Sequence, residues 1–94
     1  MQDKRFKRNQ DIVFRKIASE VILVPIRQKI ADLQNIFSLN EVGAYIWELL
    51  DGENTFSQIK EKLSNEYNIS NQIAERDLND FLQDLVANEV IDEI

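Results

Sequence analysis

The stretch that decides the fold is residues 39–52, which read LNEVGAYIWELLDG. Asn40 is a residue type that caps helix amino termini by accepting a backbone N–H bond from the first turn. Apolar residues recur after it at helical spacing, and Gly52 can adopt the left-handed conformation that ends many helices. The spacing predicts a helix that begins after Asn40, stops at Gly52 and buries Val42, Tyr45, Ile46, Trp47, Leu49 and Leu50.

Two β-rich segments precede this stretch. Residues 12–17 and 21–24 contain many β-branched and aromatic side chains, and the short turn between them favours an antiparallel hairpin. Pro25 has no backbone N–H, so the pairing of the second strand is predicted to end at or just beyond Val24, or to bulge there. Residues 33–39 are a third candidate strand, which leads directly into the helix.

The chain after residue 52 also has helical periodicity. Residues 52–55 read as a turn between helices rather than a phosphate loop, and the second helix starts after Thr55 and buries Phe56, Ile59 and Leu63. A third helix starts near Asn71 and buries Ile73, Leu78, Phe81, Leu82, Leu85 and Val86, and an apolar tail over residues 90–94 docks back. The sequence thus predicts one α+β domain over residues 1–94, with three helices on one face of a three-stranded antiparallel sheet.

The charge is distributed unevenly along the chain. Residues 1–30 hold eight Lys or Arg residues and three acids, whereas the rest of the chain holds three basic residues and fourteen acids. Residues 1–10 are predicted to be a flexible basic arm, and the alternative is an arm that contacts phosphates. An acidic third helix would be repelled by DNA phosphates, so we do not expect nucleic acid to be a partner.

The composition argues against an enzyme. The chain has no Cys and no His, and it shows no Gly-rich loop or metal-ligand cluster. Asp77, Asp80 and Asp84 share helical spacing, but such carboxylates are more often a solvated face than a metal site. We therefore expect no catalytic residue, metal or other cofactor. The chain begins without an apolar signal segment and its apolar runs are short, so we expect a cytoplasmic protein without a membrane partner.

Residues 39–52 resemble the PqqD family, whose members are also called recognition elements for ribosomally made, modified peptides. The resemblance continues through Thr55, Ile59, Leu63 and Tyr67, then through residues 74–77 and into Phe81, Leu82 and Leu85. It covers about two-thirds of the chain. It implies a winged-helix-like fold and a non-catalytic adaptor, which binds the leader of a precursor peptide and presents it to a modifying enzyme.

The resemblance also implies where the peptide binds. In PqqD-like domains the leader adds as a strand in the cleft between the third strand and the third helix, and an exposed sheet edge suits this mode because its backbone groups are unpaired. The matching strand residues are Gln34, Asn35, Ile36, Phe37 and Ser38. The matching helix residues are Asp77, Leu78, Phe81, Leu82 and Leu85, and Asp80 and Asp84 extend the acidic face that could guide a basic leader.

Several alternatives stay open. Phe37, Leu78, Phe81 and Leu85 could simply pack in the core, and the three aspartates could simply be solvated. The modifying enzyme could be a radical-SAM enzyme, a leader peptidase or a cyclase. The competing function is a small winged-helix regulator or a protein interaction module whose acidic helices meet another protein.

Overall fold

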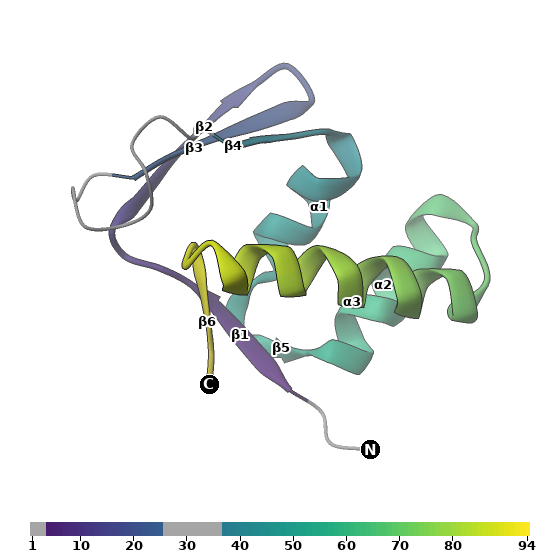
Figure 1. The fold of residues 1–94 in the computed structure, drawn as a ribbon. Coiled ribbons are helices and arrows are strands. Elements are labelled where there is room, and N and C mark those ends of the chain that lie inside the picture. Colours follow the sequence, from purple (N-terminus) through teal and green to yellow (C-terminus); the bar gives the residue numbers. More distant parts are fainter. Residues whose placement is uncertain (1–3, 26–36) are drawn as a thin grey trace.

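The computed structural model describes residues 4–25 and 37–94. Strand β1 (Arg5–Arg8) is followed by β2 (Ile12–Ile17), β3 (Glu20–Pro25) and β4 (Phe37–Leu39). The rest of the chain contains α1 (Glu41–Leu49), β5 (Asp51–Thr55), α2 (Phe56–Tyr67), α3 (Asn71–Ala87) and β6 (Ile91–Glu93). The predicted class is confirmed, because a three-stranded antiparallel sheet is followed by three helices (Figure 1).

The predicted sheet has the order β2-β3-β4, and all its pairs are antiparallel. A two-residue turn joins β2 to β3, and the pairing runs from Ile17 opposite Glu20 to Ile12 opposite Pro25. Hydrogen-bonded and non-hydrogen-bonded pairs alternate in such a ladder. Counted from the hydrogen-bonded pair Ile17–Glu20 at the turn, Ile12 and Pro25 form a non-hydrogen-bonded pair, so the Pro25 nitrogen points away from β2. Its missing N–H therefore removes no bond from the β2–β3 pair. Pairing with β2 includes Pro25, and the residues beyond it lie outside the described ranges, so the predicted end of this strand stays a prediction.

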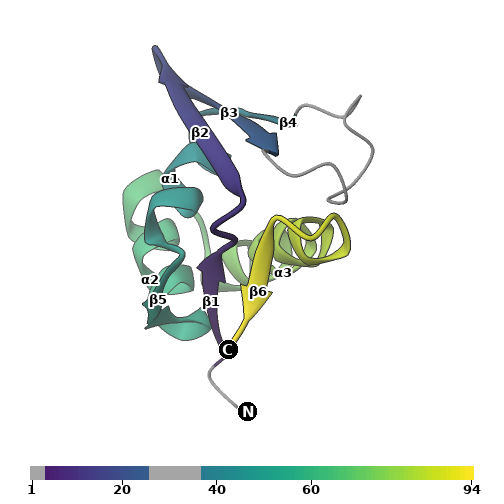
Figure 2. The ribbon, with the colours of Figure 1, turned by 90° about the vertical axis from the view of Figure 1, so that its left-hand side faces the viewer.

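Each helix begins at a side chain that the sequence makes suitable. Asn40 accepts the Gly43 N–H at 2.9 Å, Ser70 accepts the Ile73 N–H at 3.2 Å, and Thr55 forms a reciprocal capping box with Gln58. The apolar faces of the three helices then meet in one core around Trp47, which is 0% exposed. In Figure 2, α1 and α2 lie on one side of β1 and α3 lies on the other.

A second sheet, of order β5-β1-β6, was not predicted. Residues 5–8 are part of it, so the expected flexible arm is wrong for this stretch: Phe6 is buried and β1 pairs on both sides. The predicted docking of the carboxyl-terminal tail is confirmed, because Val90 and Ile91 are buried and β6 pairs with β1.

Gly52 does not end the first helix. Leu50 is the C-cap of α1, and its backbone N–H donates to the Trp47 carbonyl oxygen at 3.2 Å. Gly52 lies in β5 at φ +85°, where the register against β1 is irregular between Arg5 and Lys7. Positive φ at a glycine suits such a bulge. The predicted helix-to-helix turn over residues 52–55 is therefore a strand.

Candidate functional site

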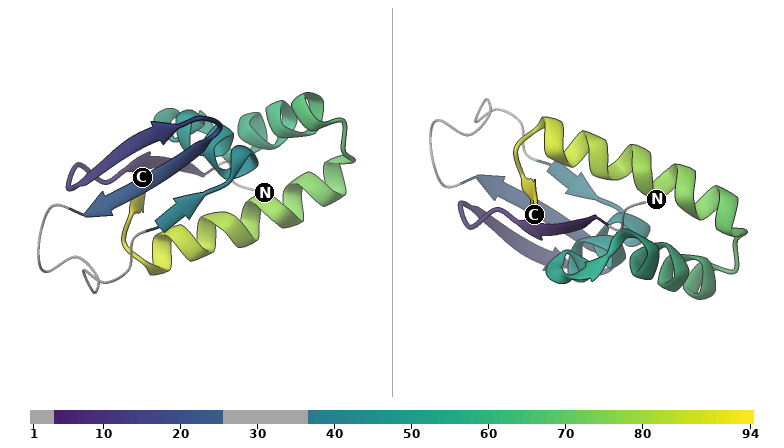
Figure 3. Two further views of the ribbon diagram at one scale, coloured as in Figure 1. Left: turned by 90° about the horizontal axis from the view of Figure 1, so that it is seen from above. Right: turned by 90° about the horizontal axis from the view of Figure 1, so that it is seen from below.

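A cleft of about 440 Å³ lies where β4 and α3 approach each other. The two elements run side by side in both views of Figure 3. The α1 amino terminus and the end of α2 close the cleft, whose lining is mostly apolar. It consists of Ser38, Leu39, Asn40, Val42, Gly43, Ile46, Leu63, Tyr67, Ile69, Ile73, Asp77 and Phe81.

Gly43 allows the walls of the cleft to come close together. A Cβ atom at this position would lie 3.2 Å from the Leu39 Cβ and 3.3 Å from two ring carbons of Phe81. Cβ atoms in proteins rarely lie so close to neighbouring atoms, so any larger residue at position 43 would push β4 or α3 slightly outward. The glycine inside α1 costs helix stability, and the cleft geometry gives a reason for its presence.

Two apolar residues that we predicted to be core face solvent at the cleft. Val42 is 39% exposed and Ile73 is 42% exposed, and both line the cleft. The prediction was wrong because helical periodicity identifies the apolar stripe but not its edges, and these residues stand at the edges of the α1 and α3 stripes. Exposed apolar side chains that gather in one depression are typical of a binding site.

The edge of β4 completes the cleft. Within the described residues β4 pairs only with β3, where Val21, Ile22 and Leu23 stand opposite Leu39, Ser38 and Phe37. Hydrogen-bonded and non-hydrogen-bonded pairs alternate from the β2–β3 turn across the sheet. By this alternation Leu39 and Phe37 exchange backbone hydrogen bonds with β3, whereas the Ser38 N–H and C=O point to the edge that faces away from β3. Ser38 is exposed. It therefore offers one donor and one acceptor to an added strand.

The structure brings together some of the residues predicted for the site. Ser38, Asp77 and Phe81 line the cleft, with Phe81 half-buried and Asp77 exposed. It places Leu78, Leu82 and Leu85 in the core, where they support α3 from behind. Asp80 and Asp84 are exposed but do not line the cleft. Phe37 begins β4, and Gln34, Asn35 and Ile36 lie outside the described residues.

Sequence reasoning missed most of the wall contributed by α1 and α2. Asn40 was recognised only as a helix cap, and Tyr67 only as part of the family resemblance. Ile69 was given no role. Asn40 precedes α1, whereas Tyr67 and Ile69 lie at the end of α2 and just beyond it, and they meet because α1 packs against α2. The feature that marks the site is the exposure of the apolar side chains of Val42 and Ile73. This exposure is visible only in the structure, because the sequence does not show which apolar residues face solvent.

The described residues show no arrangement for metal chemistry or membrane crossing. Within residues 4–25 and 37–94, no three acidic side chains lie close enough together to hold a metal ion. Over the same ranges, no helix has both the length and the apolar character needed to cross a bilayer.

Comparison with known proteins identifies relatives of this chain. The family model described as coenzyme PQQ synthesis protein D (PqqD) matches residues 20–91. The structure is similar to one described as TbiB1 in complex with the TbiA(beta) leader peptide, with a TM-score of 0.79, 30% identity, and coverage of 92% of this chain and 94% of that chain.

A more distant likeness concerns the fold alone. The structure described as the heterocyclase TruD matches with a TM-score of 0.63 and 22% identity, over 97% of this chain and 12% of that chain. Among curated proteins, no sequence matches this chain.

Proposed function

The chain belongs to the PqqD family, and on that premise we propose that it is a non-catalytic adaptor that binds the leader of a ribosomally made precursor peptide. The observation that carries the proposal is the cleft between β4 and α3, which has an apolar lining and a β4 edge that pairs with no other strand in residues 4–25 and 37–94. A structural relative with 30% identity over nearly its whole length is described in complex with a leader peptide.

The proposed mode of binding is strand addition to β4. A leader segment in extended conformation pairs with Ser38 and continues the sheet β2-β3-β4 by one strand. Its alternate side chains point into the cleft, where they bury the exposed faces of Val42 and Ile73 and meet the half-buried ring of Phe81. The main-chain bonds supply affinity for any extended peptide, and the apolar lining selects the side chains.

The adaptor acts by raising a local concentration. A leader held in the cleft keeps the rest of the precursor close to the domain, so an enzyme that contacts the adaptor meets its substrate at a high effective concentration. We propose a modifying enzyme as the second partner. The chemistry of a radical-SAM enzyme, a leader peptidase or a cyclase is compatible with this role, and the neighbouring genes would identify which of them is present.

A matched pair of charge insertions tests the proposal. Ile73 and Val86 lie on the same helix and are 42% and 41% exposed, but only Ile73 lines the cleft. Ile73→Arg should reduce the affinity for the leader encoded beside this gene by tenfold or more, because it puts a charge into the apolar lining. Val86→Arg should leave that affinity within about twofold of wild type.

Isothermal titration calorimetry on folded variants, checked by circular dichroism, measures both affinities. Equal affinity in all three proteins would show that the peptide binds elsewhere. The absence of binding by the wild-type protein to any neighbouring leader would contradict the adaptor function itself.

A further inference from the structure

A second cavity, of about 380 Å³, adjoins the cleft. Tyr67 lines both spaces, and Tyr45, Glu41, Glu48, Glu66 and Lys16 contribute to the second one. The second cavity lies at the junction between β4 and α1, because Asn40 lines the cleft and the next residue, Glu41, lines the second cavity. A peptide strand added along β4 would therefore have this cavity beside one of its ends.

Two tyrosine rings form the aromatic part of the cavity. The rings of Tyr45 and Tyr67 are 5.7 Å apart and nearly perpendicular, at 85°. Both side chains are half-buried, so part of each remains available to a ligand. The negatively charged faces of aromatic rings attract lysine and arginine side chains, and arginine also stacks on them.

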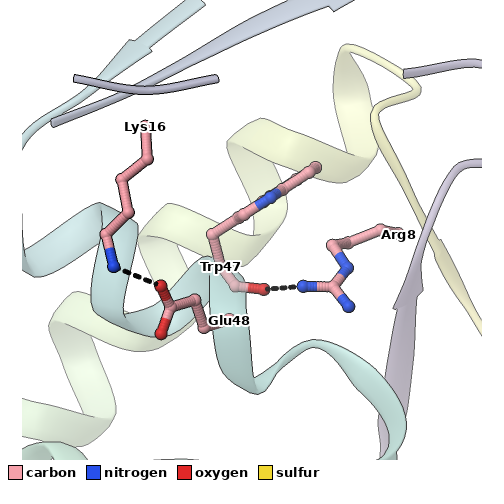
Figure 4. A network of polar contacts seen from close by, with 4 residues as sticks. All are labelled: Arg8, Lys16, Trp47 and Glu48. Carbon is pink, nitrogen blue, oxygen red and sulfur yellow. Dashed lines mark hydrogen bonds and ion pairs between the residues drawn. The ribbon is translucent and has the colours of Figure 1, made fainter. Parts of the chain in front are cut away.

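The charge of the cavity points the same way. Lys16 pairs with Glu48 at 3.0 Å (Figure 4), whereas Glu41 and Glu66 have no ion-pair partner among the residues that the structure describes. Burial raises the pKa of Tyr45 and, less strongly, so does the nearby Glu66. Burial also raises the pKa of Tyr67, with smaller contributions from Glu41 and Glu66. The two carboxylates therefore lie near the electron-rich ring faces, and this arrangement favours a cation.

We propose that this cavity receives a lysine or arginine side chain of the bound peptide, held between the tyrosine rings and the carboxylates of Glu41 and Glu66. The inference rests on the proposed function and adds a substrate class to it. The leader should combine an apolar strand segment, which fills the cleft, with a basic residue just beyond that strand. Asp77 at the cleft itself would add to the same preference.

Selection from a phage-displayed library of random extended peptides tests the inference without knowledge of the natural leader. Peptides retained by the wild-type protein should be enriched in lysine or arginine beside an apolar segment. The double variant Glu41→Gln/Glu66→Gln should select the apolar segment without the basic residue. A control variant, Glu53→Gln/Glu61→Gln, changes the net charge equally at exposed positions outside the cavity and should behave as wild type.

Affinities of one selected peptide complete the test. Replacing its basic residue by glutamine should weaken binding about five- to tenfold in the wild type and the control, and by less than twofold in Glu41→Gln/Glu66→Gln. Selected peptides that bind without a basic residue, or equal losses in all three proteins, would overturn this inference and leave the adaptor function standing. Failure of the wild-type protein to retain any peptide would instead count against the adaptor function.

Discussion

Trp47 is the residue at which the two sheets meet the helices. The ring of Phe14 in β2 meets the Trp47 ring edge to face, with 5.8 Å between the ring centres. Arg8 of β1 donates a hydrogen bond to the Trp47 carbonyl oxygen at 3.1 Å (Figure 4). The guanidinium carbon of Arg8 also lies 5.9 Å from the centre of the Trp47 ring. Its burial was predicted from the sequence and is confirmed. The contact with Arg8 was not predictable, because Arg8 lies 39 residues away and looked like part of a solvated arm.

Trp47→Ala should lower the free energy of unfolding by about 3–5 kcal/mol, because it removes a large ring from the centre of the core. Chemical denaturation followed by circular dichroism measures the loss. Trp47→Phe should cost less, since it keeps an aromatic ring and removes a buried Nε1 that has no hydrogen-bond partner in the described part of the chain. A loss below about 1 kcal/mol for Trp47→Ala would show that the ring is not central to the core.

Asp51 links stability to acid pH. Its carboxylate accepts the backbone N–H groups of Asn54 at 3.0 Å and Glu53 at 2.9 Å, and these bonds lower its pKa. The stabilising effect is therefore present above the unfolded pKa of about 3.9 and is lost as the pH falls through the lower folded value. Urea midpoints of wild type and Asp51→Asn should differ at pH 6 and converge as the pH falls below the folded pKa of Asp51. A difference that is independent of pH would exclude this linkage.

At the scale of elements, the sequence predicted the structure best where local signals suffice. The hairpin and the starts of all three helices are marked by β-branched runs and capping side chains, and they lie where expected. Strands β1, β5 and β6 were missed because they are short and rich in charged or polar residues. They exist through pairing between residues such as Phe6 and Glu93, which no local pattern reveals.

The β2–β3 turn carries a backbone strain that can be removed. Ala18 has φ 56°, in the region that favours glycine, and the two-residue turn places it at the first central position. Ala18→Gly should therefore stabilise the protein by up to about 1 kcal/mol, after the larger backbone entropy of glycine in the unfolded chain is subtracted. Thermal denaturation measures the gain. Ser19→Gly is the matched control, since Ser19 has negative φ, and it should destabilise slightly.

At the scale of the whole molecule, charge separates the adaptor from a DNA-binding winged helix. Helix α3 exposes Glu75, Asp77, Asp80 and Asp84 against a single Arg76, so its insertion into a groove would bring carboxylates toward phosphates. We expect no submicromolar affinity for duplex DNA at near-physiological salt in a fluorescence anisotropy titration. Tight binding that weakens steeply with added salt would favour the regulator, with the basic β1 and β2 strands as the contact.

The central claim is that a leader peptide binds by adding a strand to β4, and hydrogen exchange at the Ser38 amide tests it most directly. Ser38 is exposed, and the register of β4 against β3 turns its N–H toward the edge that pairs with no strand in the described part of the chain, so it should exchange rapidly in the free protein. With a saturating leader peptide, NMR should show strong protection of this amide together with shifts across Ile73, Asp77 and Phe81. A peptide that binds tightly while the Ser38 amide exchanges as fast as before would contradict strand addition.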